Sequence, residues 1–370
     1  MKTTDFLKNL IAFPSVSSET NLNCIDYIQD LLTSQGFECL RTYNKEKTKA
    51  NLVAHIGPAE RKGLFLSGHT DVVPVDGQQW TTDPFTLSLR DGKLYGRGTC
   101  DMKGFLAAVL YCIHQVPLAT LQAPLILAFT YDEEVGCVGA KQLPSLLRQL
   151  PVEAQLGVVG EPTSLKPVVA HKGIQCSCTH FRGRPAHSSS PHLGKSAIAA
   201  ASQFIQQLPS LIPDSQDERF TPPTATWNVG QIEGGSGVNI IPEHCKLTWE
   251  MRLLPGQSPE LINQKMDKML SQQRDKKIGV EQNVLSWVPA FEAKQVDRTL
   301  TVLSTILGQQ EALAVPFATE AGILQEGGFP TVVCGPGDIA QAHTADEWID
   351  PLQLALCEQF LTQLIKQICL

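Results

Sequence analysis

The stretch LFLSGHTDVVPVDGQQWTTDPFTLSLRDGKLYGRGTCDMKG, residues 64–104, decides the fold. It begins with a short apolar run at residues 64–66, which is typical of a buried strand. Directly past the expected strand end the chain presents His69 and Asp71. Ligands of open α/β sheets bind at that end of the strands. Because an imidazole with a carboxylate beside it is a common metal-site pair, we expect a metal site here, with Asp71 orienting His69.

Four further places carry an acidic or histidine side chain where a metal ligand could lie, most of them directly after a predicted strand. They are Asp101 among glycines, the acidic run 132–134 after the apolar run 124–131, Glu161 after the apolar run 155–159, and His343 after the apolar run 330–334. Taken singly, a loop histidine or a pair of acids is usually solvated. Their shared placement at predicted strand ends instead indicates one site on one sheet edge.

The candidate ligands are two histidines and several carboxylates, without cysteine. This donor set suits zinc, with cobalt or manganese as substitutes. Two metal ions about 3.5–4 Å apart need a bridging carboxylate, and Asp101 is the natural candidate. The sequence therefore predicts a two-metal hydrolase site centred on Asp101.

Strand and helix patterns alternate along residues 1–172 and resume in 288–370, which predicts an α/β catalytic domain with a mostly parallel sheet and helices on both faces. Between them, residues 173–287 follow the order βαββαβ. That order predicts an inserted ferredoxin-like α+β domain, with four strands and two helices on one face. Asp91-Gly92 between two short strand patterns predicts a hairpin.

Composition narrows the class of protein. The chain has 370 residues, 42% hydrophobic residues and a net charge of -7, which suit about two globular domains and argue against nucleic acid as a partner. No apolar run approaches a membrane span, and residues 1–15 lack the apolar core of a signal peptide. Eleven scattered cysteines without a CxxC pair make a disulfide framework improbable, so we expect a cytosolic protein.

The motifs GHTDVVP, GRGTCDMKG, DEEVG and GEP, with the loop around His343, resemble those of the co-catalytic zinc amidohydrolases, a family that includes aminoacylase, carboxypeptidase G and succinyl-diaminopimelate desuccinylase. The resemblance covers essentially the whole chain. It implies two zinc ions, or cobalt in their place, and a small-molecule N-acyl amino acid as substrate. The segments GEPTSLKPVVAHKG, TEAG and CGPGDIAQAH imply hydrolysis of N2-acetyl-L-ornithine to L-ornithine and acetate.

The resemblance also implies a role for each matching residue. His69, Asp101 and Glu161 would hold one metal ion, and Asp101, Glu134 and His343 the other. Glu133 would be the general base. The resemblance further implies that the inserted domain forms a homodimer, as it often does in this family. His187 in GRPAHSSS matches a histidine that stabilises the transition state and commonly reaches the active site of the partner subunit. Asn239 and Arg252 match positions that bind the substrate carboxylate.

Several alternatives stay open at this point. His187 could be an ordinary polar loop residue. Glu320 in FATEAG is a candidate contact for the cationic ornithine side chain, or simply a helix N-terminal charge after Thr319. The chain could instead be a desuccinylase or a general aminoacylase, or a metal-binding scaffold without catalysis. A serine hydrolase is disfavoured, because residues 234–238 miss the last glycine of a GxSxG elbow.

Overall fold

The computed structural model describes residues 2–275, 277–294 and 296–370. The chain divides into two units. Unit 1 comprises residues 1–170, 291–313 and 319–370, and unit 2 comprises 171–290 and 314–318. The segment 314–318, expected in the catalytic domain, groups with unit 2. The backbone explains this, because Lys172 N–H donates to the Val315 carbonyl at 3.2 Å.

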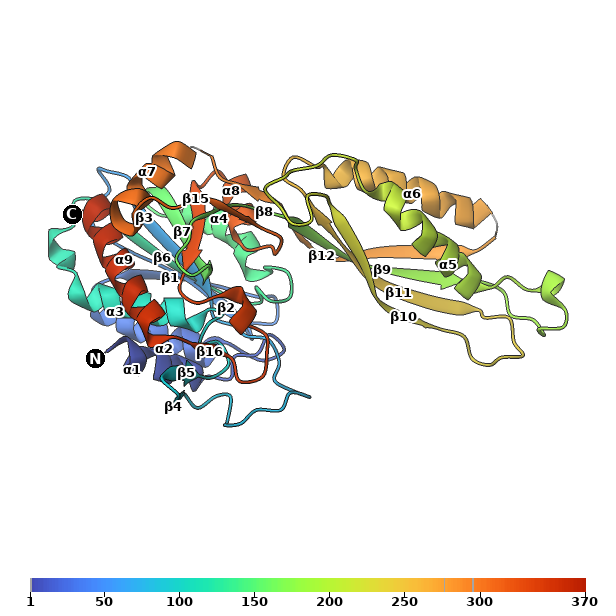
Figure 1. Cartoon of the computed structure of the whole chain (residues 1–370), viewed down its shortest axis with the longest axis horizontal. Helices are drawn as coiled ribbons and strands as arrows, with labels where there is room; N and C mark the ends of the chain where they lie inside the picture. Colours follow the sequence, from blue (N-terminus) through green and yellow to red (C-terminus); the bar gives the residue numbers. More distant parts are fainter. Residues whose placement is uncertain (1, 276, 295) are drawn as a thin grey trace. The chain divides into compact units, whose positions relative to one another are not determined.

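Unit 1 is built on one mixed sheet with the order β1-β2-β6-β3-β7-β15-β8-β13 (Figure 1). The central pairs β6–β3, β3–β7 and β7–β15 are parallel, as the sequence predicts. The pairs β1–β2, β2–β6 and β15–β8 are antiparallel. The strands of this sheet are β1 (Glu38–Tyr43), β2 (Ala50–Ile56), β3 (Gly63–His69), β6 (Leu125–Thr130), β7 (Ala154–Pro162), β8 (Val168–His171), β13 (Phe291–Glu292), β14 (Leu313–Val315, beside β8) and β15 (Thr331–Gly335).

Helices cover both faces of this sheet, which explains why every residue of β3 and β6 is buried (Figure 1). One face carries α1 (Thr3–Ile11), α2 (Leu22–Ser34), α3 (Lys103–Gln115), α7 (Val296–Leu307) and α9 (Pro351–Cys369), which share a core with the alternate side chains Leu64 and Leu66 of β3. The other face carries the shorter α4 (Leu143–Leu147) and α8 (Ala321–Glu326).

The stretch 64–104 contributes two strands to a small three-stranded sheet. This sheet contains β4 (Ser88–Arg90), β5 (Lys93–Tyr95) and β16 (Trp348–Ile349). The expected hairpin is confirmed: β4 and β5 pair antiparallel across Asp91 and Gly92, whose φ angles of 50° and 74° fit a tight two-residue turn. The pairing of β16 with β5 brings the segment after His343 against the segment that leads to Asp101.

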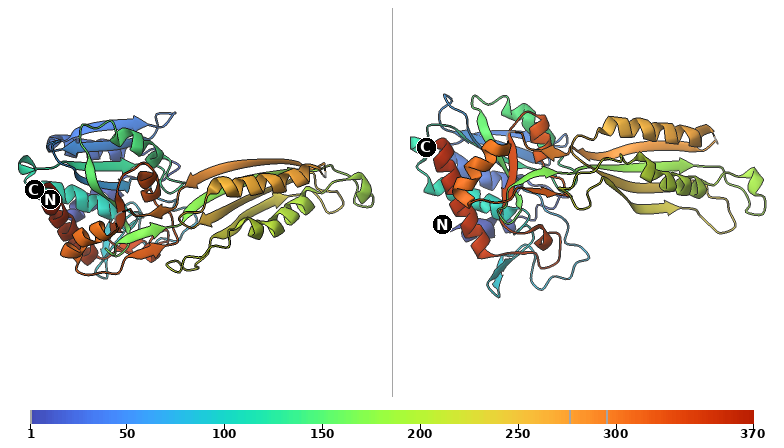
Figure 2. Two further views of the ribbon diagram at one scale, coloured as in Figure 1. Left: turned by 90° about the horizontal axis from the view of Figure 1, so that it is seen from above. Right: turned by 45° about the horizontal axis from the view of Figure 1, so that its top comes forward.

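Unit 2 has the predicted βαββαβ order. Its elements are β9 (Gly173–Arg182), α5 (Ala197–Gln207), β10 (Thr226–Gly234), β11 (His244–Leu253), α6 (Pro259–Asp275) and β12 (Gly279–Val288). The sheet order is β10-β11-β9-β12, and every pair is antiparallel. Both helices pack on one face (Figure 2), where Phe181, Leu247 and Trp249 share a buried cluster with Phe204 of α5 and Met266 of α6.

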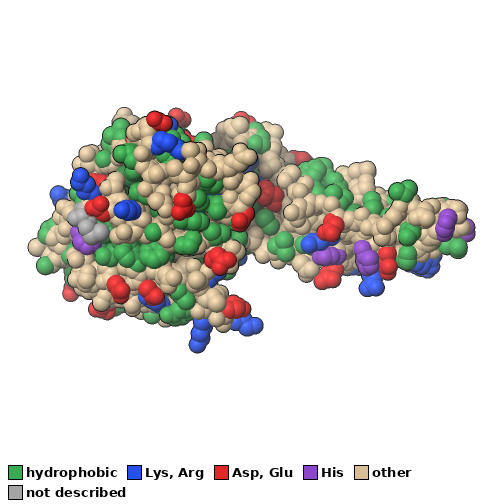
Figure 3. All heavy atoms as spheres, turned by 90° about the horizontal axis from the view of Figure 1, so that it is seen from below, with side chains coloured by type: hydrophobic (Ala, Val, Ile, Leu, Met, Phe, Trp, Pro, Cys, Tyr) green, Lys and Arg blue, Asp and Glu red, His purple; other side chains and the backbone are tan. Residues whose placement is uncertain are grey.

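In Figure 3 basic, acidic and histidine side chains are interspersed on the visible face, with no large patch of one sign. None of the helices among the described residues has the length and apolar character that crossing a membrane requires.

Candidate metal centre

The expected ligands converge on one edge of the unit 1 sheet because parallel strands end there together. His69 is the last residue of β3 and pairs with Thr130, the last residue of β6. Glu133 and Glu134 follow β6 directly, and Glu161 lies near the end of the neighbouring β7. His343 lies in the loop after β15, the next strand in the sheet. The fold therefore brings side chains from four strand ends to one place.

Asp101 lies between the two histidines. Its Oδ1 is 3.0 Å from His69 Nε2, and its Oδ2 is 3.2 Å from His343 Nε2. His343 Nε2 is also 3.0 Å from Glu134 Oε2, while Glu161 Oε1 is 3.9 Å from His69 Nε2. One carboxylate thus has an oxygen directed to each of two imidazoles. That is the arrangement expected of a residue that bridges two cations.

The donor set fits divalent cations. Ligand atoms of His69, Asp101 and Glu134 lie within 4.8 Å of one another, as do those of His69, Glu133 and Glu161. Glu161 is only 4% exposed, and its Oε1 has no hydrogen-bond donor among the described residues. A buried carboxylate oxygen without a donor is costly unless a cation approaches it. Imidazole and carboxylate donors suit zinc and its neighbours in the transition series.

Crowding of carboxylates changes the proton affinity of the cluster. Burial raises the pKa of Glu133 to about 8 and that of Glu134 to about 7, and nearby carboxylates add to both shifts. Burial and the charge of Asp101 raise the pKa of Glu161 well above its usual range. Glu133, with a pKa near neutrality, is suited to proton transfer.

The two histidines have the opposite effect on Asp101. Burial alone would raise the pKa of this carboxyl, but hydrogen bonds from His343 and His69 outweigh burial and lower it. Hydrogen bonds to Asp101 and Glu134 raise the pKa of His343 to about 10. The cluster without cations therefore holds protons on its histidines, and a bound cation must displace them.

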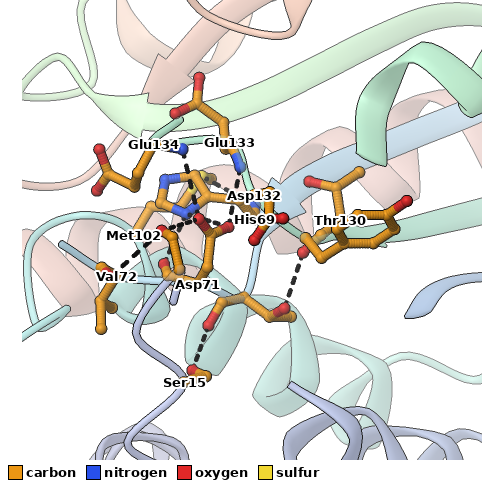
Figure 4. Close-up of polar contacts among 12 residues, drawn as sticks. Ser15, His69, Asp71, Val72, Met102, Thr130, Asp132, Glu133 and Glu134 are labelled. Carbon is orange, nitrogen blue, oxygen red and sulfur yellow. Dashed lines mark hydrogen bonds and ion pairs between the residues drawn. The ribbon is translucent and has the colours of Figure 1, made fainter. Parts of the chain in front are cut away.

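Asp71 is placed differently from its predicted role. The His69 ring nitrogen Nδ1 is 2.8 Å from the backbone carbonyl of Asp71 but 3.6 Å from its carboxylate. The carboxylate instead accepts hydrogen bonds from the backbone N–H groups of Glu133 at 3.1 Å and Glu134 at 3.4 Å (Figure 4). It also accepts from Ser17 Oγ at 2.6 Å. The side chain of Asp71 thus supports the acidic loop, and its carbonyl orients His69.

The third acid of the run 132–134 does not join the cluster. Asp132 has a φ of 54°, and its carboxylate is 2.6 Å from Lys49 Nζ. The repulsion expected among three adjacent acids is therefore relieved in part by a local ion pair. Glu133 and Glu134 remain directed toward His69 and His343.

Glu320, for which the sequence leaves open a substrate contact or a helix N-terminal charge, is fully buried. It accepts hydrogen bonds from the hydroxyls of Ser67 and Thr130, the latter at 2.9 Å. Both oxygens are thus engaged at the ends of β3 and β6. Glu320 directly precedes α8, but its side chain makes no capping hydrogen bond to that helix.

His187, Asn239 and Arg252 all lie in unit 2. Ser188 N–H donates to the Asn239 carbonyl at 3.0 Å, and His187 forms an isolated β-bridge with Ile240, so the segments of His187 and Asn239 are neighbours. Arg252 lies at the far end of β11 and donates to Glu250 Oε1 at 3.1 Å. Their roles toward the metal centre remain predictions.

Two functional contacts escaped sequence reasoning. Glu347 accepts hydrogen bonds from the backbone N–H groups of Cys100 at 2.9 Å and Asp101 at 3.1 Å, so it fixes the backbone that presents the Asp101 carboxylate. The Cys137 thiol donates to Glu133 Oε1 at 3.1 Å. Neither Glu347, which follows another acid, nor Cys137, one of eleven cysteines, stands out in the sequence. Both contacts depend on tertiary structure.

Residues 65–367 match the model of the family described as Peptidase family M20/M25/M40, and the chain belongs to this family. Similar curated relatives are named acetylornithine deacetylase. The one from Myxococcus xanthus is 38% identical, with 98% of this chain and 96% of the relative covered. The one from Photorhabdus laumondii is 35% identical, with 99% and 97% covered.

Solved structures show the same fold. A metallo-carboxypeptidase of the M20 family, Sso-CP2 from Sulfolobus solfataricus, matches with a TM-score of 0.81 at 18% identity and covers 99% of both chains. The aminopeptidase PepT from Bacillus cereus matches with a TM-score of 0.75 at 23% identity, with 99% of this chain and 97% of that chain covered. The Bacillus subtilis YXEP protein, described as a dinuclear metal-binding peptidase of the M20 family, matches with a TM-score of 0.69 at 18% identity.

Proposed function

We propose that this protein hydrolyses the amide bond of N2-acetyl-L-ornithine to give L-ornithine and acetate, a step of arginine biosynthesis, using two zinc ions. The observation that carries the proposal is Asp101 with one oxygen on each of two histidines, beside an acid of raised pKa. The choice of acetylornithine among N-acyl amino acids is supported by the relatives of the same name, which align along nearly the whole chain.

The two cations share Asp101 in this proposal. His69, Asp101 and Glu161 would hold one, and Asp101, Glu134 and His343 would hold the other. When bound, cations at these residues would lower the pKa of the attacking water and polarise the acyl oxygen. Cobalt can replace zinc in a site with these donors.

The protein side chains supply the proton transfers. Glu133 accepts a proton from the attacking water and returns it to the departing nitrogen. Its raised pKa of about 8 lies near the pH of the medium, which suits both transfers. Cys137 holds one oxygen of Glu133, which leaves the other free to take the proton. His187 donates a hydrogen bond to the oxygen on which negative charge develops. Asn239 and Arg252 bind the substrate carboxylate.

Geometry within unit 2 supports a homodimer. Asn239 lies before His244, the first residue of β11, whereas Arg252 is the next-to-last residue, and at 3.3 Å per residue His244 and Arg252 are separated by about 26 Å. One copy of unit 2 cannot place both on one carboxylate. We therefore propose that His187 and Asn239 come from one subunit and Arg252 from the other, with the subunits joined through unit 2. Mixed dimers of His187→Ala and Arg252→Ala chains should then regain activity that neither variant shows alone.

The proposed location is the cytosol. All eleven cysteines are free thiols, and most of them are buried. This is the usual state in a reducing compartment.

The test is a metal-dependent assay. The purified protein, assayed for ornithine release, should hydrolyse acetylornithine, lose that activity after chelation and recover it with zinc. Hydrolysis of acetylmethionine and of succinyl-diaminopimelate is measured in parallel. These two substrates distinguish the proposed activity from the alternatives, aminoacylase and desuccinylase activity. Activity that survives complete metal removal, or a clear preference for either competing substrate, would overturn the proposal.

A further inference from the structure

A buried ion pair joins the segments that carry Asp101 and His343. Arg97 Nη1 is 2.7 Å from Glu347 Oε2, and both side chains are 1% exposed. Glu347 also accepts from the backbone N–H groups of Gly98 at 3.0 Å and of Cys100 and Asp101 through its other oxygen. One carboxylate, four residues after His343, thus fixes the loop that presents the bridging Asp101.

Arg97 continues this network toward the His343 loop. Its Nη1 donates to the Thr344 carbonyl at 3.3 Å, and its Nη2 donates to Gln78 Oε1 at 2.6 Å. The Gln78 amide then donates through Nε2 to the carbonyl of His343 at 3.0 Å. Gln78 therefore accepts a hydrogen bond from Arg97 of the buried ion pair through Oε1. Through Nε2 it donates to the backbone of His343, one of the proposed metal ligands.

His343 needs such a restraint. Its φ is 60°, in the left-handed region that residues other than glycine adopt at a cost, and its side chain is 50% exposed. Little packing therefore fixes the imidazole. The contacts that remain are those of its ring with Asp101 and Glu134 and that of its carbonyl with Gln78.

We propose that Gln78 is a positioning residue for the second cation. Together with Arg97 and Glu347 it sets the distance between His343 and Asp101. This inference rests on the proposed function in one respect, the assignment of Asp101, Glu134 and His343 as ligands of one cation. The first cation, on His69, Asp101 and Glu161, should depend far less on Gln78, because the Gln78 side chain contacts the His343 carbonyl directly but reaches the Asp101 loop only through Arg97.

Gln78 can be replaced without removing the buried ion pair. It is only partly buried, and Gln78→Met keeps the chain length while it removes the donor and the acceptor. The matched control is Gln79→Met. Gln79 is exposed and makes no hydrogen bond within the part of the chain that the structure describes.

The experiment is a titration of the metal-free protein with Zn²⁺ in competition with a chromophoric chelator. Wild type and Gln79→Met should bind two ions with the same two affinities. In Gln78→Met the first affinity should be unchanged and the second about tenfold weaker, as for loss of a supporting contact around a metal ligand. Equal melting temperatures of the two metal-free variants would show that the folds are equally stable.

Two results would overturn the inference. In one, Gln78→Met binds the second ion as tightly as Gln79→Met; in the other, both of its affinities fall together. A wild-type chain that binds fewer than two ions would instead contradict the proposed metal centre itself. The titration therefore separates failure of the positioning role from failure of the proposed function.

Discussion

The role of Asp71 can be tested by removing its carboxylate. Asp71→Ala eliminates the acceptor of three donors, namely Ser17 Oγ at 2.6 Å and the N–H groups of Glu133 at 3.1 Å and Glu134 at 3.4 Å. Ser17 and Asp71 are 8% and 2% exposed, so water does not readily replace the lost acceptor. The substitution therefore leaves the part-buried N–H groups of Glu133 and Glu134 without this acceptor, and Ser17 Oγ with only the Val72 carbonyl at 3.5 Å.

The expected loss of stability follows from these contacts. A buried donor without a partner costs about 1–3 kcal/mol, and the 3.4 Å contact is the weakest of the three. We therefore expect a loss of about 3 kcal/mol, which corresponds to a fall in melting temperature of roughly 4–6 °C for a cooperative unit of this size. Activity should fall as well, because Glu133 and Glu134 lose their support.

The assay is thermal unfolding at a fixed, saturating zinc concentration, followed by circular dichroism. Asp76→Ala is the matched control: Asp76 lies in the same segment, is exposed and makes no hydrogen bond among the described residues. If Asp71→Ala melts at the same temperature as Asp76→Ala, the carboxylate does not hold the 133–134 loop and the reasoning is wrong.

Three further predictions concern the chemistry of the centre. Glu133→Gln should lower kcat by about 10²–10⁴-fold while zinc stoichiometry stays at two, and a near-normal kcat would exclude Glu133 as the general base. Zinc binding at pH 7 should release protons, and the zinc affinity should rise from pH 6 to pH 8. The reason is that the pKa values of Glu134, Glu133 and His343 are about 7, 8 and 10, so cations must displace bound protons. Calorimetry in two buffers measures this release, and an affinity independent of pH would contradict the prediction. Glu320→Gln should reduce kcat/KM for acetylornithine and acetylmethionine equally, since its partners are Ser67 and Thr130, and a selective loss with acetylornithine would favour a substrate contact instead.

The sheet edge could be predicted from sequence because the signals are strong and local. Strands buried on both faces read as apolar runs, and β3 and β6 lie where residues 64–67 and 124–131 indicate. Once those strands are parallel neighbours, His69 and the acids after Thr130 must lie at the same edge. The meeting of Asp101 with both histidines depends in addition on tertiary contacts, namely the pairing of β16 with β5 and the hydrogen bonds from Cys100 and Asp101 to Glu347.

Other features could not be predicted because they depend on tertiary contacts. Glu347 carries no signal in the sequence, and the sequence leaves Glu320 open between a substrate contact and a helix N-terminal charge. Only the approach of distant hydroxyl and backbone donors explains why both side chains are buried.

The most direct test of the two-cation centre is anomalous X-ray scattering from crystals grown with zinc. We predict two zinc peaks about 3.5–4 Å apart, with one oxygen of Asp101 directed to each, one peak beside His69 and Glu161 and the other beside Glu134 and His343. A single peak, or two peaks that do not share Asp101, would contradict the bridging role from which the proposed chemistry follows.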